Sequence, residues 1–395
     1  MTEETTLPVG PQHPALKEPA SFELTVDGEE IVDAHLSLSH NHRGIEQAAL
    51  SKSYIENIYL LERICGICSH SHTTAFVGAI EELADLDVPP RARYLRSLVG
   101  ELERIHSHML WLGVAGHEIG FETLWQYAWR DREIVLDLLE SLTGNRVHYA
   151  INTPGGVRED LTDDHRAELR DGIDDLRKRM DFYARTVPEE ETVRMRLAGV
   201  GHVSKERTKE LCAAGPTARA SGVDTDVRRD DPYAAYDELD FEVVTEDGGD
   251  LLARTVVRIR EIQQSLDLIE QVLDRIPEGP IAPETPLQAR LAGLGEGTVT
   301  SRYEAPRGEL FHYVASDGSD EPARVHVRVP TLANWPTVVE SLRGANLADT
   351  PIVVAGIDPC ISCTSRIGVD VAGGDDHTLD DLRAYAFEYY DQEAP

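Results

Sequence analysis

Cysteine is the residue type in this chain best suited to bind a transition metal, and four of the five cysteines form two CxxC pairs. Cys65 and Cys68 lie in the segment RICGIC, and Cys360 and Cys363 lie in DPCISC. The i, i+3 spacing lets two thiolates face one ion from a single turn, so two pairs can build a four-thiolate site. Soft thiolates select zinc, iron–sulfur clusters or other late transition metals. Cys212 stands alone beside small residues, and we expect it at a plain core position.

The spacing of the two pairs leaves several kinds of site open. A structural zinc site usually has its second pair about 15–20 residues after the first, whereas most of the chain separates Cys68 from Cys360. Two inert buried pairs and a cluster held wholly by this chain are further alternatives. In a cytosolic protein disulfides are rare, so paired CxxC motifs point to metal or redox chemistry.

Acidic residues dominate the charge of the 395-residue chain. Asp and Glu number 71 against 38 Lys and Arg, which gives a formal net charge of -33. This charge excludes a nucleic-acid-binding protein, because phosphate contacts need a basic surface, and it disfavours direct binding to an anionic membrane. Only five of the 38 cations are lysines. Such a chain suits a cytosol at molar salt, where the Debye length is about 3 Å, so we expect a halophilic source; an ordinary acidic protein is the alternative.

No segment of the sequence predicts membrane insertion or export. None reaches the roughly 18 apolar residues of a membrane-spanning helix, and the apolar run PIVVAGI (351–357) predicts a core strand by its length. The N-terminal segment MTEETTLPVG lacks the basic and apolar regions of a signal peptide. We therefore expect a cytoplasmic protein that reaches a membrane only through its partners.

Hydrophobic periodicity predicts a mainly helical α+β fold. Residues 21–39 alternate as two strands around a turn at Asp27–Gly28. Helical spacing recurs in six segments, 44–61, 69–86, 94–112, 124–142, 164–187 and 251–276. Gly144 ends the fourth of these helices, residues 277–300 predict a loop, and strands follow over 308–329. We expect one domain over residues 1–366, made of a β region (1–43), a helical bundle (44–276) and a C-terminal β region (300–366), followed by a tail (367–395).

The sequence around the cysteines resembles nickel–iron hydrogenase large subunits. RICGICSHSH and DPCISCTSR are similar to the two active-site motifs of that family. Six further segments resemble its membrane-bound, energy-converting group (group 4), namely GPQHPALKEP (10–19), HRGIE (42–46), GELERIHSHMLWLG (100–113), GNRVHYAINTPGGVR (144–158), GPTARASG (215–222) and EAPRGELFHY (304–313). The same segments resemble the homologous 49 kDa (D) subunit of respiratory complex I, whose members lack the cysteine pairs. The presence of all four thiols favours the metal-bearing hydrogenases.

This resemblance implies the fold and the cofactor. The fold would be a hydrogenase large-subunit-like helical bundle with small β-sheets near the N- and C-terminal ends. The cofactor would be nickel bound by four thiolates, with Cys65 and Cys360 terminal on nickel. Cys68 and Cys363 would bridge to an iron that carries carbonyl and cyanide ligands. A cysteine sulfur can take up a proton when dihydrogen is cleaved heterolytically.

Four further residues match positions around that site. Glu18 matches the proton-relay glutamate of the family, with a solvated acid as the plain alternative. Arg307 matches the arginine above the metals, which can polarise dihydrogen or hold the diatomic ligands, with a structural salt bridge as the alternative. Pro306 and Asp358 would help to shape this roof.

The histidines and two departures from the family pattern complete the predicted site. His72 lies one helical turn after Cys68 and could hydrogen-bond a bridging sulfur, whereas the roles of three others stay open (His70, His106 and His108). Uptake hydrogenases have an aspartate where this chain has Ser107, so we expect the arginine to lack its carboxylate partner. They also have a metal-binding histidine where this chain has Arg366, which cannot ligate a metal. We expect Arg366 to pair with Glu46 instead.

The resemblance implies a catalytic subunit of a membrane-bound hydrogenase that reversibly reduces protons to dihydrogen. Its partners would be a small subunit with a four-iron–four-sulfur cluster, membrane antiporter-like subunits, and ferredoxin or a formate- or carbon monoxide-oxidising module. The chain would lie on the inner face of the cell membrane within this complex. One alternative is a sulfur or polysulfide reductase. Another is a structural or quinone-binding subunit of a complex-I-like NADH–quinone oxidoreductase, a class associated with NAD binding, in which the thiols would hold zinc or nothing. Some relatives lose the C-terminal tail by proteolysis after nickel insertion.

Overall fold

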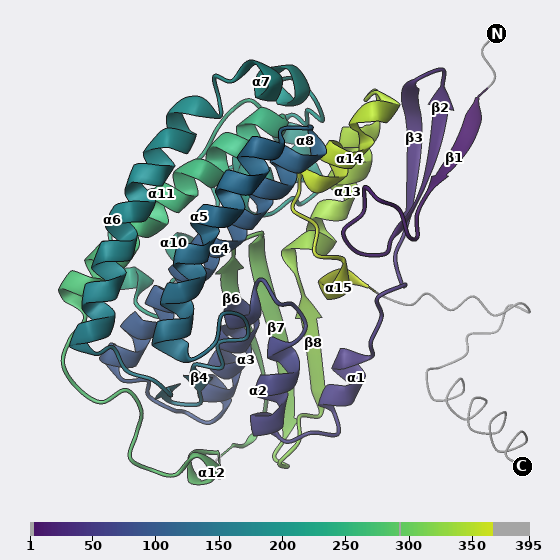
Figure 1. Ribbon diagram of the computed structural model, residues 1–395. Helices are drawn as coiled ribbons and strands as arrows, with labels where there is room; N and C mark the ends of the chain where they lie inside the picture. Colours follow the sequence, from purple (N-terminus) through teal and green to yellow (C-terminus); the bar gives the residue numbers. More distant parts are fainter. Residues whose placement is uncertain (1–3, 292–293, 366–395) are drawn as a thin grey trace, which may run out of the picture. The chain divides into compact units, whose positions relative to one another are not determined.

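Four long helices form the body of the protein and pack against one another (Figure 1). They are α4 (Pro90–Glu118), α5 (Glu122–Thr143), α6 (Asp163–Thr186) and α11 (Leu251–Arg275). In the computed structural model, which describes residues 4–291 and 294–365, each of them buries an apolar stripe in a shared core. Pro90 begins α4, where its missing N–H costs nothing. Gly144 ends α5 with a φ of 81°, as its position predicted.

Two shorter helices and α3 surround the first cysteine pair. The predicted helix 44–61 is in fact two helices, α1 (Ile45–Ala49) and α2 (Tyr54–Glu62). The break occurs because Ser53 and Glu56 form a capping box that starts a new helix. The next helix, α3 (Ser69–Leu83), agrees with the prediction and begins directly after Cys68.

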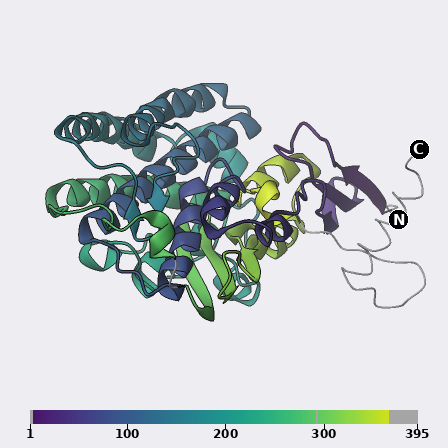
Figure 2. The same cartoon turned by 90° about the horizontal axis from the view of Figure 1, so that it is seen from below.

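Two three-stranded antiparallel sheets lie at the two ends of the sequence. The first contains β1 (Thr5–Val9), β2 (Ser21–Asp27) and β3 (Glu30–Ser37) in that order, and Figures 1 and 2 place it beside α13 (Pro330–Leu342). The second contains β6 (Glu296–Ala305), β7 (Gly308–Asp317) and β8 (Arg324–Arg328). The predicted fold class, mainly helical α+β with small terminal sheets, is therefore confirmed.

The run PIVVAGI is not a strand. Its residues belong to α14 (Thr350–Ala355), with Pro351 in the first turn. A short apolar run has no periodicity that separates a buried helix from a buried strand, and a proline at a helix start favours the helix. The remaining short elements are β4 (Asn152–Thr153), β5 (Gly156–Val157), α7 (Glu191–Leu197), α8 (Lys205–Glu210), α9 (Pro216–Arg219), α10 (Val227–Asp230), η1 (Tyr236–Glu238), α12 (Leu287–Arg290), η2 (Leu347–Asp349) and α15 (Ile361–Thr364).

The fold brings the two ends of the described chain together at the cysteines. Helix α3 packs against β6 and β7, while α13 packs against β7 and α15. One hydrophobic cluster consequently contains both cysteine pairs together with apolar residues of α2, α3 and the second sheet. The residues up to Ser365 form one unit by their contacts, and Arg366 with the C-terminal tail lies outside the described residues. Among the described residues, no helix is long and apolar enough to cross a membrane.

Candidate metal centre

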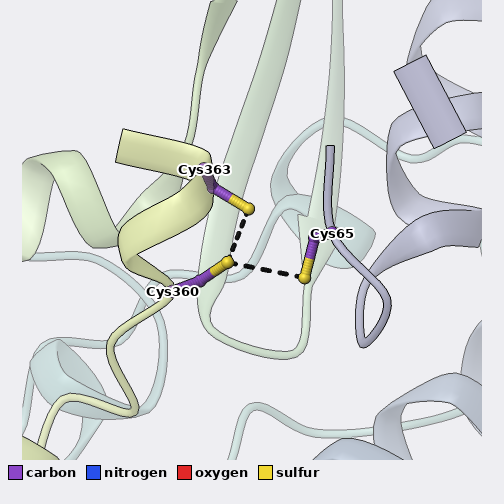
Figure 3. A group of neighbouring side chains, drawn as sticks. All are labelled: Cys65, Cys360 and Cys363. Atoms are coloured by element: carbon purple, nitrogen blue, oxygen red, sulfur yellow. Dashed lines mark hydrogen bonds between the residues drawn. The ribbon is translucent and has the colours of Figure 1, made fainter. Parts of the chain in front are cut away.

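Three cysteine sulfurs point toward one another in the interior (Figure 3). The Sγ of Cys360 lies 3.4 Å from that of Cys65 and 2.6 Å from that of Cys363. The sulfurs of Cys68 and Cys363 lie within 4.8 Å of each other and of a ring nitrogen of His72. All four paired thiols are buried. The structure therefore brings together the four residues that the sequence predicted as metal ligands. Cys212, expected in the core, is instead exposed after α8 with a φ of 53°.

The thiols of this cluster influence one another strongly. Hydrogen bonds from Cys360, Cys363 and Cys68, with the charge of Arg307, hold the pKa of Cys65 well below its ordinary value. Burial raises the pKa of Cys363 well above its ordinary value. A soft divalent metal is the partner that would make several adjacent buried thiolates compatible.

A buried ion pair covers the cluster. The Arg307 guanidinium donates from Nε to the backbone oxygen of Asp358 at 2.6 Å and from Nη2 to its Oδ1 at 2.7 Å, and the side chains are only 3% and 10% exposed. The expectation that Arg307 lacks a carboxylate is therefore wrong. Asp358, two residues before Cys360, supplies it, while Ser107 Oγ lies 3.4 Å from Nη1. Pro306 is buried in the same β6–β7 turn.

Glu18 joins the N-terminal segment to the second cysteine motif. Its carboxylate accepts backbone hydrogen bonds from Ile361 at 2.6 Å and from Ser362 at 3.1 Å, and the Ser362 hydroxyl contacts the same carboxylate. Burial raises the pKa of Glu18, and these backbone donors oppose the rise. The carboxylate of Glu18, the predicted acid–base residue, therefore contacts the backbone of the two residues that follow Cys360.

The buried histidines of this region have different partners. His72 Nε2 lies 3.9 Å from the Cys363 sulfur, and its Nδ1 lies 3.1 Å from His312 Nε2. His312 was not singled out from the sequence, although it stands inside the motif EAPRGELFHY. The three other histidines contact protein groups: His70 contacts the Arg96 carbonyl, His106 accepts from Arg132, and His108 contacts Glu261.

Glu103 is a second site residue that sequence reasoning missed. Its carboxylate is fully buried and accepts from the backbone N–H of His70 at 2.7 Å and of Ser71 at 3.1 Å. The Ser71 hydroxyl donates to it at 2.5 Å. Burial raises the pKa of Glu103 to about 8. Its position in GELERIHSH, one residue before Arg104, gives no local signal that it reaches the start of another helix.

Glu46, on α1, lies beside β8 of the second sheet. It accepts from the backbone N–H of Val327 at 2.9 Å and contacts the His326 ring at 3.2 Å. Its predicted partner Arg366 lies outside the described residues, so their pairing stays a prediction.

A cavity of about 520 Å³ opens beside the cluster. Its walls are mostly apolar and include Trp111, Trp129 and Ile67. The charged side chains in the lining are mainly basic, in contrast to the acidic chain as a whole: Lys17, Arg43, Arg63 and Arg307 against Glu18 and Asp358. Cys65 and Cys360 also line it. The cavity thus gives small molecules access to two of the four sulfurs.

The residues present fit a thiolate-bound metal with additional small ligands. The four sulfurs supply a soft donor set. Asp358 Oδ2 is buried and has no hydrogen-bond partner among the described residues, so the roof of the cluster offers a polar atom still able to bind a further group.

Comparisons with known proteins agree with this site. The family described as respiratory-chain NADH dehydrogenase, 49 kDa subunit, matches residues 118–366, and the nickel-dependent hydrogenase family matches residues 43–113. The chain is 43% identical to the membrane-bound hydrogenase subunit alpha of Pyrococcus furiosus, over 92% of this chain and 88% of that one. It is 39% identical to the carbon monoxide-induced hydrogenase of Rhodospirillum rubrum, over 91% and 99%.

A solved structure with the same fold is that of the membrane-bound sulfane sulfur reductase, an archaeal respiratory membrane complex. One of its chains matches with a TM-score of 0.87 and 35% identity, over 92% of this chain and 99% of that chain. The relatives of the present chain are oxidoreductase subunits of membrane-bound complexes. The chain belongs to the family that unites the large subunits of group 4 membrane-bound nickel–iron hydrogenases with the 49 kDa subunit of respiratory complex I.

Proposed function

We propose that the chain is the catalytic large subunit of a membrane-bound nickel–iron hydrogenase, which reversibly reduces protons to dihydrogen. The observation that carries this proposal is the convergence of four buried thiols from the two ends of the chain. A subunit that only transmits conformational change or binds quinone has no need of four paired thiols. The 43% identity to a hydrogenase alpha subunit supports the same function.

Each residue of the site has a role in this proposal. Cys65, Cys68, Cys360 and Cys363 would hold nickel and an iron with carbonyl and cyanide ligands, and this group would supply the two-electron chemistry of dihydrogen. Glu18 accepts protons from the cluster side and passes them toward the cavity, because its carboxyl is half-buried there with a raised pKa.

The arginine and its partner act on the other side of the cluster. Arg307 presents a fixed positive charge above the sulfurs, where it stabilises negative charge on them. Asp358 fixes the orientation of this guanidinium through two hydrogen bonds. Its Oδ2, which has no hydrogen-bond partner among the described residues, can accept a hydrogen bond from a protonated group at the cluster.

The proposed partners follow from the same assignment. We propose a small subunit with a four-iron–four-sulfur cluster that delivers electrons, membrane antiporter-like subunits, and ferredoxin or a formate- or carbon monoxide-oxidising module as the source of electrons. The chain would then lie on the cytoplasmic face of the membrane. Its membrane association would come from these partners.

Sulfur reduction is the second candidate function, and the cavity favours it. A volume of about 520 Å³ beside the sulfurs exceeds what dihydrogen needs, and its basic lining would suit an anionic sulfur chain. The likeness to a chain of the sulfane sulfur reductase complex points the same way. A quinone-linked function, suggested by the 49 kDa subunit family, would leave the four thiols unexplained.

Metal analysis and infrared spectroscopy of the anaerobically purified complex test the proposal. One nickel per chain, together with carbonyl and cyanide bands and dihydrogen evolution from a reduced donor, is the expected result. The Cys65→Ser variant should lose nickel, whereas the matched Cys212→Ser variant, at an exposed cysteine, should keep it. Zinc or no metal in mature wild-type complex would contradict the hydrogenase assignment. Nickel with reduction of sulfane sulfur but no dihydrogen turnover would favour the second function.

A further inference from the structure

Two buried histidines form a chain that ends at the sulfur of Cys363. His72, on α3, has its Nε2 at 3.9 Å from this sulfur and its Nδ1 at 3.1 Å from His312 Nε2. His312, on β7, lies with its ring 5.4 Å from the ring of His72. Both side chains are fully buried. The order of contacts is therefore His312, His72 and Cys363.

Both imidazoles are fully buried, and burial disfavours a charged ring. Neither ring has a carboxylate hydrogen-bond partner among the described residues. A neutral imidazole carries one N–H, and the position of that proton is set by its neighbours.

The contact between the rings admits two arrangements of these protons. In the first, His72 Nδ1–H donates to His312 Nε2. The His72 Nε2 lone pair then faces the Cys363 sulfur, and His312 must carry its proton on Nδ1. That atom is buried and has no hydrogen-bond partner among the described residues, so this arrangement leaves an unpaired buried donor there and, once the Cys363 sulfur is a thiolate, two facing lone pairs as well.

The second arrangement removes both penalties. His312 Nε2–H donates to His72 Nδ1, so His72 carries its proton on Nε2 and directs it to the Cys363 sulfur. The unpartnered His312 Nδ1 is then a bare acceptor, and acceptors without partners are better tolerated in protein interiors than orphaned N–H groups. We infer that His312 is a positioning residue of the metal centre, which fixes the tautomer of His72 so that its Nε2–H points at Cys363.

This inference has a consequence for the chemistry of the cluster. A sulfur that accepts a hydrogen bond is a weaker base and a weaker metal donor than the same sulfur without it, so the Nε2–H of His72 lowers the proton affinity of Cys363 and weakens its donation to the metal. This consequence rests on the proposed function, whereas the tautomer of His72 does not.

Nitrogen-15 NMR of the full chain labelled at histidine tests the tautomer directly, because the ring nitrogens have different shifts when protonated and unprotonated. The signals of His72 and His312 are assigned by their loss in His72→Gln and His312→Gln. The expected wild-type pattern is a protonated Nε2 and an unprotonated Nδ1 on His72. A protonated Nδ1 would overturn the inference and would favour His72 as a metal ligand beside Cys68 and Cys363, whose ligand atoms lie within 4.8 Å of one another.

Two variants separate a positioning role from a packing role. His312→Leu removes the donor and should abolish the pure Nε2–H pattern of His72, whereas His312→Gln keeps an amide N–H near the same place and should retain it. His326→Gln, at a partly exposed histidine of the neighbouring strand, is the matched control and should change nothing. An unchanged His72 in His312→Leu refutes the inference. If that variant does not fold, the wild-type and His312→Gln spectra still decide.

Infrared spectra of the loaded complex give an independent readout. If carbonyl and cyanide bands are present in the wild type, they should shift in His312→Leu and stay in His312→Gln. Identical bands in all three proteins would refute the effect on Cys363. Absence of the bands from the wild type would refute the hydrogenase assignment and leave the NMR result standing.

Discussion

The ion pair between Arg307 and Asp358 allows a quantitative test of the site, through Asp358→Asn. Asparagine has nearly the shape of aspartate and tolerates the positive φ of 56° at this position. The backbone contact from Arg307 Nε is also retained, because it ends on a carbonyl oxygen. The substitution therefore removes one buried charge and little else.

The burial of the pair sets the expected size of the effect. The Nη2–Oδ1 distance is 2.7 Å, and the two side chains are 3% and 10% exposed. Breaking such a buried pair costs about 3–5 kcal/mol, because the remaining charge has no partner. The negative charge on Cys65 still attracts Arg307, so we expect the lower end, about 3 kcal/mol. Arg307→Met added to Asp358→Asn should recover part of this loss, since it removes the unpaired charge.

Equilibrium unfolding in urea, extrapolated to water, measures this loss for the full chain. Asp33→Asn is the matched control, because Asp33 pairs with Arg343 at 2.9 Å on the surface, where both side chains are about half exposed. An exposed pair contributes little, so the control should unfold like the wild type. A loss in Asp358→Asn no larger than in the control, or a double variant as unstable as the sum of the two single variants, would refute the assignment of a strong buried pair.

Three further predictions concern other residues of the site. Glu103 has a folded-state pKa of about 8, above its ordinary value, so the folded chain keeps a proton that the unfolded chain loses. The free energy of unfolding should therefore fall by about 2–3 kcal/mol between pH 6 and 8. Urea unfolding of Glu103→Gln should lack this decrease, and an equal pH dependence of the unfolding free energy in both proteins would contradict the prediction. Cys212 should react with a thiol reagent in the native apo chain while Cys68 and Cys363, which are buried and do not line the cavity, react only after denaturation, and mass spectrometry that finds native labelling at these two would contradict their burial. Glu18→Gln should lower dihydrogen–deuterium exchange by about 10²-fold or more with nickel and infrared bands unchanged, and full exchange in that variant would exclude Glu18 as the proton carrier.

The elements with long periodic patterns were predictable from the sequence. The helices α4, α5, α6 and α11 each repeat apolar residues over many turns, so the burial of one stripe is visible locally. The hairpin around Gly28, whose φ is 66°, carries a turn signal of its own. The short helices between residues 191 and 230 were not predicted, because four to seven residues contain too few turns to show a period.

The site was predictable where motifs carried it and not where folding alone creates a contact. The four paired cysteines, Glu18 and Arg307 stand in recognisable segments. The prediction for Arg307 was wrong because it considered only the position of Ser107, where uptake hydrogenases have an aspartate. Asp358 reaches the same guanidinium from a position 51 residues later in the chain, and only the packing of the β6–β7 turn reveals it. His312 and Glu103 escaped attention for the same reason.

The two cysteine motifs have the same local geometry at the start of a helix. In each motif a cysteine occupies the N-cap position of a helix, Cys68 for α3 and Cys360 for α15, and neither sulfur caps its helix. N-cap side chains ordinarily accept hydrogen bonds from the first backbone N–H groups, but these sulfurs point into the cluster instead.

Two distant carboxylates take over this role. Glu103 accepts from the second and third N–H groups of α3, and Glu18 accepts from the first and second of α15. The sulfurs are therefore free to bind metal because carboxylates from other parts of the chain satisfy the amides that they leave uncapped. The Glu18 side chain therefore has two roles, proton transfer and support of the Cys360 turn. Glutamine retains an acceptor oxygen and so removes only proton transfer, whereas alanine would remove both roles.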